Sequence, residues 1–548
     1  MKKIFTILAF LSFSVASALA QWPTNDQDYT ILGTDSVYGQ CQIKTLRTND
    51  GKTILTWLNH PKDIHYSDPN YGYYLYLQIF DANGQPIFEK SGKIISNKST
   101  KSWVTDYGLQ LTDNGDLLFS YTDTRNDSNK QVGENYLYRY SQTGQPVWNK
   151  DGVKLNSSHN YPSYSDINPL LCVSGNNIYA SYVHSEYHKI KADSTNWEPS
   201  PWDPDDTMPD SITVSEEAIR ITRLNADGSD AWVTPIEFDY NDAWMYPGPE
   251  GKLYVVYVNK GFGFSARLID KDGKDVWNAP ATVESGTITS GSFTTQPEVK
   301  SDGNGGLVFA YRKLLNFSGY IVTQHLTADG TVYEESLSAN GSTDGNGDCP
   351  EIAIKDGKVF IAWSYDNTEG TKDLMVNQLS IDDDYTWDGD SLLGYSLDQN
   401  EMWGLKAIKV IPQPNGWIVL YGNCQSWNGA DFYVCKIRED GKVAWKKQIA
   451  ESNFKSSGFS VVYDDEKAYI FYTCDKEIGD DWEEIPGPGG MRVMCVDISD
   501  ATNNICSLIH NEKQPTFYNV QGVRLNNGNQ KGLVLIKENG ITKKILNR

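Results

Sequence analysis

The sequence lacks any apolar run long enough to cross a bilayer, both within its first 20 residues and after them, so it predicts no membrane span. Signals for helices are nearly absent. The sequence contains no glycine-rich phosphate loop, nucleophile elbow or Cys/His dyad, so none of these motifs indicates an enzymatic activity. Positive charge is in short supply, because 48 Lys and Arg stand against 71 Asp and Glu, a formal net charge of -23. Nucleic acid is therefore a poor partner, and the charge fits solubility outside a cell.

What the sequence does contain is a short apolar strand ending in an aromatic residue, repeated at intervals of about 59 residues, a spacing typical of stacked supersecondary units. Each copy lies between shorter strand patterns separated by glycine-containing turns, as in residues 297–336, which read as four antiparallel strands. Four short strands per repeat form the blade of a β-propeller. The eight copies are residues 53–57, 117–121, 178–182, 253–257, 307–311, 359–363, 417–421 and 468–472.

We therefore predict an all-β protein, an eight-bladed β-propeller followed by a small C-terminal β unit, with a seven-bladed ring as the alternative. Residues 1–20 have Lys2 and Lys3, an apolar run and a small-residue end at Ala20, which predicts a signal peptide. Residues 21–40 are expected to be a lead-in, residues 41–510 the propeller and residues 511–548 the C-terminal unit. The expected location is extracellular or on the outer cell surface after signal-peptide cleavage.

A second recurring element places a tryptophan four residues after a turn glycine, as in Gly144 to Trp148, Gly228 to Trp232 and Gly273 to Trp277. Glycine allows the positive φ of such a turn, and the indole can lie across the neighbouring blade, so these tryptophans are expected to be structural. The element resembles the tryptophan-docking repeat of quinoprotein-type propellers. No quinone-site residues accompany it, and no cofactor is expected. The Asp-box of sialidases also differs, because its glycine lies three residues before the tryptophan.

Residues 516–546 carry three short strand patterns. The first contains Tyr518, Asn519 and Gly522, and the third is basic, with Lys543 and Lys544. This pattern resembles the C-terminal sorting domains that the type IX secretion system of Bacteroidetes recognises. The resemblance implies contact with the secretion machinery through residues 511–548, followed by release or surface attachment. The alternative is a small β appendage without a role in sorting.

The connections between second and third strands are long and varied, whereas the opposite turns are short, so we predict that the long-loop face binds ligand. Exposed tryptophan beside carboxylates suits sugar rings, because indole stacks on the apolar face of a pyranose and carboxylates accept hydroxyl hydrogen bonds. Arg125 and Arg312 lie just beyond second strands and are candidates as well. The candidate ligand residues are Trp197, Trp202, Asp203, Asp206, Tyr66, Tyr71, Trp427, Trp482, Arg125 and Arg312.

Metal binding is weakly indicated. His184, Glu186 and His188 alternate, but we expect them to lie in a loop, residues 184–217, where such a spacing fixes no common face. A second set, Asp344 to Asp348, lacks the glutamate of a calcium loop. No metal site is predicted.

Export makes disulfides permissible. We predict Cys424–Cys435 and Cys474–Cys495 as pairs that hold the bases of two neighbouring loops, and Cys41–Cys506 as a closure of the ring. Cys172 and Cys349 have no evident partners.

These patterns favour an exported propeller that binds glycan or an extracellular protein. The alternative is a glycan-degrading enzyme, a glycosidase or lyase with carboxylates in the central pit. An enzyme should place two or three carboxylates with perturbed titration in that pit, whereas a binding protein should present aromatic side chains at its rim.

Overall fold

The computed structural model describes residues 29–32, 38–61, 68, 71–89, 91–100, 106–127, 132–155, 159–193, 195–197, 207–238, 242–259, 263–285, 297–315, 318–333, 336–338, 346–366, 372–381, 391–392, 405–426, 429–452, 454–455, 459–473, 476–478, 484–486, 491–499, 516–518, 524–525, 532–538 and 541–547. The chain divides into two units, Met1–Val496 and Asp497–Arg548. Within the described residues, the one helical segment is the single turn η1 (Pro249–Gly251). None of the described helical segments could cross a membrane.

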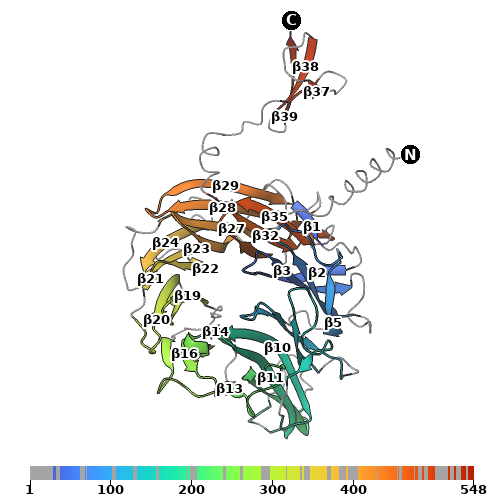
Figure 1. Cartoon of the computed structure of the whole chain (residues 1–548), viewed down its shortest axis with the longest axis vertical. Coiled ribbons are helices and arrows are strands. Elements are labelled where there is room, and N and C mark those ends of the chain that lie inside the picture. Colours follow the sequence, from blue (N-terminus) through green and yellow to red (C-terminus); the bar gives the residue numbers. More distant parts are fainter. Residues whose placement is uncertain are drawn as a thin grey trace, which may run out of the picture. The chain divides into compact units, whose positions relative to one another are not determined.

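The first unit contains eight four-stranded antiparallel sheets arranged around a common centre, as the blades of a β-propeller are (Figure 1). The first strand of a blade lies next to the centre and the fourth lies at the periphery. Blades 1 to 4 are β2 (Tyr38–Arg47), β3 (Thr53–Pro61), β4 (Tyr73–Phe80) and β5 (Lys93–Thr100); β6 (Gly108–Leu111), β7 (Leu117–Asp123), β8 (Glu134–Tyr140) and β9 (Val153–Lys154); β10 (Ser163–Ser174), β11 (Asn177–Lys191), β12 (Ser211–Leu224) and β13 (Ile236–Phe238); and β14 (Ala243–Pro247), β15 (Leu253–Val258), β16 (Phe264–Ile269) and β17 (Ala281–Glu284).

Blades 5 to 7 follow the same order. They are β18 (Glu298–Ser301), β19 (Leu307–Leu315), β20 (Ser318–Leu326) and β21 (Ser336–Ser338); β22 (Asn346–Lys355), β23 (Lys358–Asp366), β24 (Lys372–Ser380) and β25 (Ser391–Leu392); and β26 (Leu405–Gln413), β27 (Gly416–Ser426), β28 (Gly429–Arg438) and β29 (Val443–Ser452). A further sheet contains the short strands β30 (Phe454–Lys455), β33 (Lys476–Ile478) and β34 (Glu484–Pro486).

Each repeated apolar strand of the sequence is the second strand of a blade, which confirms the eight-bladed prediction. Its side chains are buried on both faces because each blade packs against two neighbours, and the terminal aromatics Trp57, Tyr121 and Trp363 are almost completely inaccessible. One apolar cluster, for example, joins Leu75 of blade 1 to Phe119 of blade 2. Burying a side chain of this size stabilises the fold by roughly 1.5–3 kcal/mol.

Blade 8 is built from both ends of the unit. Three of its strands, β31 (Phe459–Tyr463), β32 (Lys467–Thr473) and β35 (Met491–Asp497), come from the C-terminal side. The fourth is β1 (Tyr29–Leu32), which pairs antiparallel with β35, Tyr29 opposite Met494 and Leu32 opposite Met491. Residues 29–32 are therefore part of the propeller, although the sequence analysis placed them in a lead-in of residues 21–40. The pairing of β1 with β35 thus ties the segment that precedes blade 1 into the last blade.

The tryptophans that follow turn glycines hold each blade to the next, as predicted. The indole Nε1 of Trp148 donates to the carbonyl of Ala226, 2.8 Å away, in the turn of the following blade. Trp232 repeats this contact with Lys271 at 2.9 Å, and Trp277 repeats it with Ala328 at 3.2 Å. Each indole covers a turn glycine with positive φ, Gly228 at 88° in the first case. A side chain at this glycine would collide with the indole, so the turn and the tryptophan require each other.

Replacing Trp148 by Ala should lower the free energy of unfolding by about 2 kcal/mol, because an inter-blade hydrogen bond and the packing of a half-buried indole are lost together. Chemical denaturation of the purified chain measures the change. Trp148→Phe keeps most of the packing and should lose less than half as much. Equal losses in the two variants would contradict a role for the Nε1 hydrogen bond and the larger ring.

The second unit contains a four-stranded sheet in the order β37 (Arg524–Leu525), β36 (Thr516–Tyr518), β38 (Gly532–Glu538) and β39 (Ile541–Asn547). The first strand pattern expected in this unit thus corresponds to two strands, β36 and β37. β38 and β39 make a hairpin with Glu538 opposite Ile541. This sheet confirms a small β unit at the C-terminus.

The predicted Cys424–Cys435 disulfide is wrong. Cys435 is a buried free thiol. Its partner across the strand pair is Val419, and Cys424 lies five residues further along β27, beyond the Cα separation that a disulfide can bridge. Burial raises the pKa of the Cys435 thiol to about 12. Cys474 and Cys506 lie outside the described residues, so the pairs Cys474–Cys495 and Cys41–Cys506 remain predictions.

Candidate functional site

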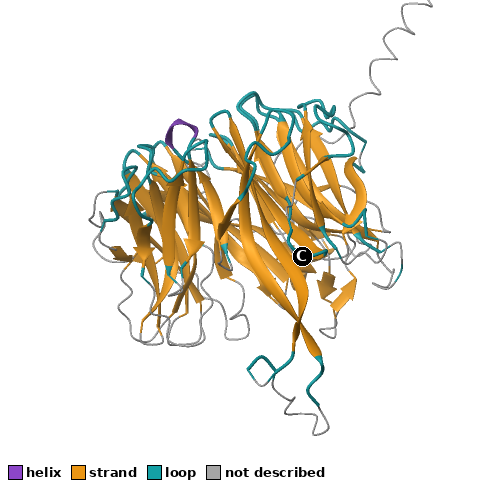
Figure 2. Ribbon diagram, turned by 90° about the horizontal axis from the view of Figure 1, so that it is seen from below, coloured by secondary structure: helices purple, strands orange, loops and turns teal. Residues whose placement is uncertain are grey.

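The long-loop face of blade 3 is shaped by a long β hairpin. The sequence-based loop of residues 184–217 is largely strand, because pairing between β11 and β12 continues without a register shift to Lys191 opposite Ser211. Figure 2 shows this hairpin extending past its neighbours on the face opposite η1. Alternating residues of a strand share one face, so His184, Glu186 and His188 do lie on a common face.

At the base of this hairpin a buried imidazole lies between two carboxylates. His184 Nδ1 is 2.6 Å from Asp166 Oδ1 of β10, and His184 Nε2 is 2.9 Å from Glu186 Oε1. Burial lowers the pKa of His184, but the bonds to Asp166 and Glu186 outweigh it, and the pKa is raised. Burial likewise opposes ionisation of Glu186, yet its bonds to His184 and to backbone N–H groups hold its pKa below the usual value. The cluster therefore favours an imidazolium paired with carboxylates.

Glu186 also fixes the chain that enters blade 3. Its carboxylate accepts hydrogen bonds from the backbone N–H of Asn160, at 2.9 and 3.0 Å, and from that of Tyr161, at 3.1 Å. Both oxygens of the Glu186 carboxylate therefore accept hydrogen bonds from the protein. Its role is to position the loop at residues 159–162.

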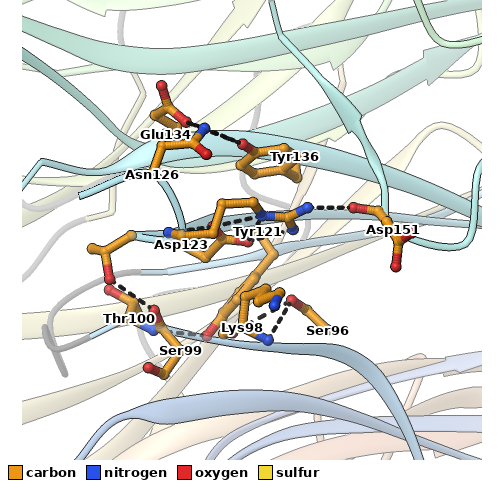
Figure 3. A network of polar contacts seen from close by, with 12 residues as sticks. Ser96, Lys98, Ser99, Thr100, Tyr121, Asp123, Asn126, Glu134, Tyr136 and Asp151 are labelled. Carbon is orange, nitrogen blue, oxygen red and sulfur yellow. Dashed lines mark hydrogen bonds and ion pairs between the residues drawn. The ribbon is translucent and has the colours of Figure 1, made fainter. Parts of the chain in front are cut away.

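A second carboxylate, Glu134 at the start of β8, links blade 2 to blade 3. Glu134 Oε1 accepts from Lys154 Nζ at 2.5 Å and from the Tyr164 hydroxyl of β10 at 3.2 Å. Glu134 Oε2 accepts from Asn126 and from the Tyr136 hydroxyl, and Figure 3 shows these three side chains together. Burial raises the pKa of Glu134, but the bonds to Lys154 and Asn126 reverse this, and the carboxylate stays ionised.

Arg125, predicted to contact ligand, is occupied by the protein itself. Its guanidinium binds both oxygens of the fully buried Asp123, with Nη2 2.6 Å from Oδ2, and donates to the carbonyl of Asp151 at 2.6 Å. It lies 3.5 Å from the centre of the Tyr136 ring, a cation–π arrangement. Arg125 therefore organises the end of β7, close to the contacts drawn in Figure 3, and it has little capacity left for ligand.

Above these buried groups, two tyrosine–histidine pairs are partly exposed at the entrance to blade 3. The ring of Tyr161 stacks on His188 at 4.1 Å with an interplanar angle of 12°, and His159 stacks on Tyr164 at 4.0 Å and 16°. We call Tyr161, His188, His159 and Tyr164 the aromatic rim. The bonds from Glu186 to Tyr161 and from Tyr164 to Glu134 tie the rim to the carboxylates beneath it.

The other predicted ligand residues are scattered or lie outside the described residues. Tyr71 is half-buried in blade 1, its hydroxyl 3.1 Å from that of Tyr73. Trp197 is half-buried beyond the end of β11, and Arg312 lies within β19 of blade 5, so the structure does not group Arg125 with Arg312. The residues outside the described part are Tyr66, Trp202, Asp203, Asp206, Trp427 and Trp482.

Sequence reasoning missed Asp166, Glu134 and the aromatic rim. Asp166 could have been found, because a carboxylate within a first strand interrupts a pattern that should otherwise be apolar or neutral. Nothing in the sequence pairs it with His184, 18 residues away. Across the described residues, no three His, Cys, Asp or Glu side chains are arranged to hold a metal ion.

Replacing Asp166 by Asn should lower the pKa of His184, because a neutral amide no longer stabilises the imidazolium. Histidine-selective NMR titration measures this pKa directly. The loss of a charge-assisted bond should also destabilise the fold by about 1 kcal/mol near pH 6. Because the folded-state pKa of His184 lies above 6.5, this stabilisation is complete below that pH and is lost as the pH rises through the folded-state pKa. A His184 titration unchanged by Asp166→Asn would contradict the assignment.

Compared with known protein families and with curated proteins, the chain matches none. Among solved structures it is similar to a protein of unknown function from Dyadobacter fermentans, at 12% identity and a TM-score of 0.36, over 86% of this chain and 98% of that one. An ulvan lyase of the PL25 polysaccharide lyases aligns at 11% identity and a TM-score of 0.39, over 87% and 99%. The NanB sialidase of Streptococcus pneumoniae aligns at 11% identity and a TM-score of 0.32, over 88% and 94%. At this level of similarity, function has to be argued from the residues of this chain.

Proposed function

We propose that the protein is an exported β-propeller that binds glycan through the long-loop face of blades 2 and 3. The observation that carries the proposal is the aromatic rim, two stacked tyrosine–histidine pairs held over carboxylates that the protein itself saturates. Rings fixed in this way present apolar faces to a ligand at little further entropic cost. Sugar rings have apolar faces that stack on aromatic side chains, and their hydroxyls suit the nitrogen and oxygen atoms at the ring edges.

The buried groups beneath the rim support binding more than catalysis. The carboxylate oxygens of Asp123, Glu134 and Glu186 all accept hydrogen bonds from donors of the protein. A general acid or base needs an oxygen that can reach the substrate, and these carboxylates have none directed outward.

Export is part of the proposal and rests on the sequence. The N-terminal signal pattern and the resemblance of residues 511–548 to a type IX sorting domain support passage to the cell surface or the medium. The partners we propose are therefore an extracellular glycan and, through the C-terminal unit, the secretion machinery.

A glycan array probed with residues 21–548 tests the function, with Tyr161→Ala and His188→Ala as the decisive variants. We expect wild-type binding to at least one glycan, and a loss of about tenfold in affinity in each variant, typical of removing a central aromatic contact. Blade 5 supplies a matched control, because His325 and Tyr333 form a similar stacked pair at 5.3 Å and 11°, away from the rim. Tyr333→Ala should bind as wild type. An array silent for the wild type would contradict a glycan ligand and leave an extracellular protein as the partner to seek.

A glycan-degrading enzyme is the second candidate, and one observation favours it. Glu351 and Glu298 lie on neighbouring first strands, β22 and β18, at the centre of the ring. Burial, followed by the charge of Glu298, raises the pKa of Glu351 to about 7. A buried carboxyl group with a raised pKa, close to a second carboxyl group, suits the general acid in cleavage of a glycosidic bond. Reducing-sugar release from array hits, abolished by Glu351→Gln, would establish this activity.

A further inference from the structure

Both ring nitrogens of His184 face carboxylate oxygens, Nδ1 that of Asp166 at 2.6 Å and Nε2 that of Glu186 at 2.9 Å. An ionised carboxylate only accepts hydrogen bonds, and a neutral imidazole has a single N–H donor, so the imidazolium alone satisfies both contacts. The three side chains are at most 4% exposed, so water has little access to replace a lost contact. The geometry therefore requires a proton on each nitrogen of His184.

The other titratable groups on this face of blade 3, and those that reach it from blade 2, contact one another. Arg220 of β12 opposes protonation of His184 through its charge, but Arg220 has a carboxylate partner of its own. The contacts are Arg220 with Glu237 at 2.7 Å, Lys154 with Glu134 at 2.5 Å and His188 with Glu216 at 3.8 Å. Asp166 and Glu186 are thus left to His184, and they lose their balancing charge when it is neutral.

The two carboxylates differ in what else holds them. Among the described residues, His184 is the one donor to the Asp166 carboxylate, whereas Glu186 also accepts from the backbone N–H groups of Asn160 and Tyr161. When His184 loses one proton, the other is therefore expected to stay on Nδ1, where Asp166 has no substitute for it. The lone pair of Nε2 then faces Glu186 Oε1, and two acceptors at 2.9 Å repel each other.

Glu186 links this buried pair to the aromatic rim. Its carboxylate holds the N–H groups of Asn160 and Tyr161, and the Tyr161 ring stacks on His188 at 4.1 Å. His188 lies two residues beyond Glu186 on β11, so one strand and one carboxylate fix both rings of this stacked pair. If Glu186 is displaced, the ring of Tyr161 is no longer fixed, and its ordering then has to be paid when a glycan binds.

We propose that His184 is a positioning residue of the aromatic rim: its imidazolium holds Glu186 against the backbone of Tyr161, and loss of the proton releases the rim and weakens glycan binding. This inference rests on the proposed glycan function and deepens it, because it states the condition under which that site binds. His184 is buried beneath the rim and acts through Glu186, without contact to the glycan.

The direction of the pH effect follows from this proton. Burial lowers the pKa of His184, but its bonds to Asp166 and Glu186 outweigh burial, so the folded-state pKa lies above 6.5. The binding-competent form is therefore complete near pH 6 and is lost as the pH rises through the folded-state pKa. The apparent affinity for glycan falls in proportion to the fraction of chains in the competent form.

The affinity of residues 21–548 for the glycan with the strongest array signal at about pH 6, measured from about pH 5 to 9, tests the proposal. We expect the wild-type affinity to fall at least about fivefold at the alkaline end, the lower limit of typical coupling between sites. The midpoint should match the His184 titration measured by NMR. Asp166→Asn should lower this midpoint and Arg220→Gln should raise it, because the first removes an anion and the second a cation near the imidazole. Arg220→Lys keeps the charge and should keep the wild-type midpoint.

Two controls separate His184 from the other histidines. His159→Phe and His188→Phe keep an aromatic ring at the rim without its ionisation, so each should retain the midpoint although the affinity itself changes. Blade 5 offers a matched pair, because His325 Nε2 is 3.0 Å from Asp302 Oδ2. His325→Gln should keep both the affinity and the midpoint of the wild type.

Hydrogen exchange of the backbone amides of Asn160 and Tyr161 tests the positioning without any glycan, because both amides donate to Glu186. After correction for the intrinsic effect of pH on exchange, their protection should fall as the pH rises through the His184 midpoint. In Asp166→Asn the protection should fall at a lower pH.

Glycan binding without pH dependence, or with a midpoint that Asp166→Asn and Arg220→Gln leave unchanged, would overturn the proposal and leave the glycan function standing. An array silent for the wild type at about pH 6 would contradict the glycan function instead. The amide exchange then decides about His184: protection that falls with the His184 midpoint supports its positioning role, and protection independent of pH overturns it.

Discussion

Residues 35–548 should be less stable than residues 21–548 by about 3 kcal/mol and should associate into dimers or larger species. The deletion removes β1, and with it the four-residue pairing to β35 that completes blade 8. Intramolecular hydrogen bonds contribute about 1 kcal/mol each. The exposed edge of β35 can then pair with another chain, because an uncovered strand edge is a template for strand addition.

Guanidinium denaturation measures the stability, and size-exclusion chromatography with light scattering measures the association. The matched control is residues 27–548, which keeps β1 and should behave as residues 21–548 do. If the longer deletion unfolds at the same denaturant concentration and stays monomeric, β1 does not hold the ring together.

Replacing Glu351 by Gln should stabilise the propeller by about 2 to 3 kcal/mol at pH 8 and have a much smaller effect at pH 5. In the unfolded chain the carboxyl ionises near its usual value of 4.5, whereas in the folded chain burial and Glu298 raise the pKa to about 7. An acid whose folded-state pKa is raised destabilises the fold as the pH climbs from 4.5 to 7, and the full cost is present above that range. Glutamine has the same shape and no charge, so it removes the cost.

Thermal unfolding at the two pH values measures this effect, with Glu466→Gln as the control for loss of an exposed carboxylate. Surface substitutions of that kind usually change stability by less than about 0.5 kcal/mol. A Glu351→Gln variant less stable than wild type at pH 8 would mean that Lys409 and Lys300 stabilise the ionised carboxylate more than burial destabilises it.

The repeated core of the fold is readable from the sequence because it obeys a local rule. Every second strand is buried on both faces, so it must be an uninterrupted apolar run, and a terminal aromatic such as Trp57 fills the space between blades. The spacing from a turn glycine to its tryptophan, as in Gly144 to Trp148, is equally local, and three of these tryptophans, Trp148, Trp232 and Trp277, pack on a turn glycine of the next blade. Blade number and blade docking follow from these two signals.

Features that depend on distant pairing could not be predicted. β1 has only four residues, and its partner strand lies at the other end of the unit. The hairpin of β11 and β12 looks like a loop because His184, Glu186 and Glu217 are polar, although cross-strand pairing keeps them in a sheet. The Cys424–Cys435 pair was inferred from loop position, and the register of β27 against β28 separates the two residues.

The candidate sites likewise combine residues that local sequence signals predict with contacts that depend on distant segments. Arg125 was found as an unusual residue, but its carboxylate partner Asp123 and the Tyr136 ring beneath it turn it inward. The first-strand residues that lie at equivalent positions around the centre, such as Glu298 and Glu351, could have been predicted, because each precedes its second strand in the same way. Their interactions could not, since these depend on which blades are neighbours.

The pairing of β1 with β35 also sets an order of events during synthesis. Tyr29 is translated before any of the first seven blades, and its partner Met494 appears only after all seven have been translated. Until then the first blades have no closed ring, and closure must join segments of very large sequence separation, a step that slows folding. The last contact of the ring to form is therefore the one that makes the propeller circular.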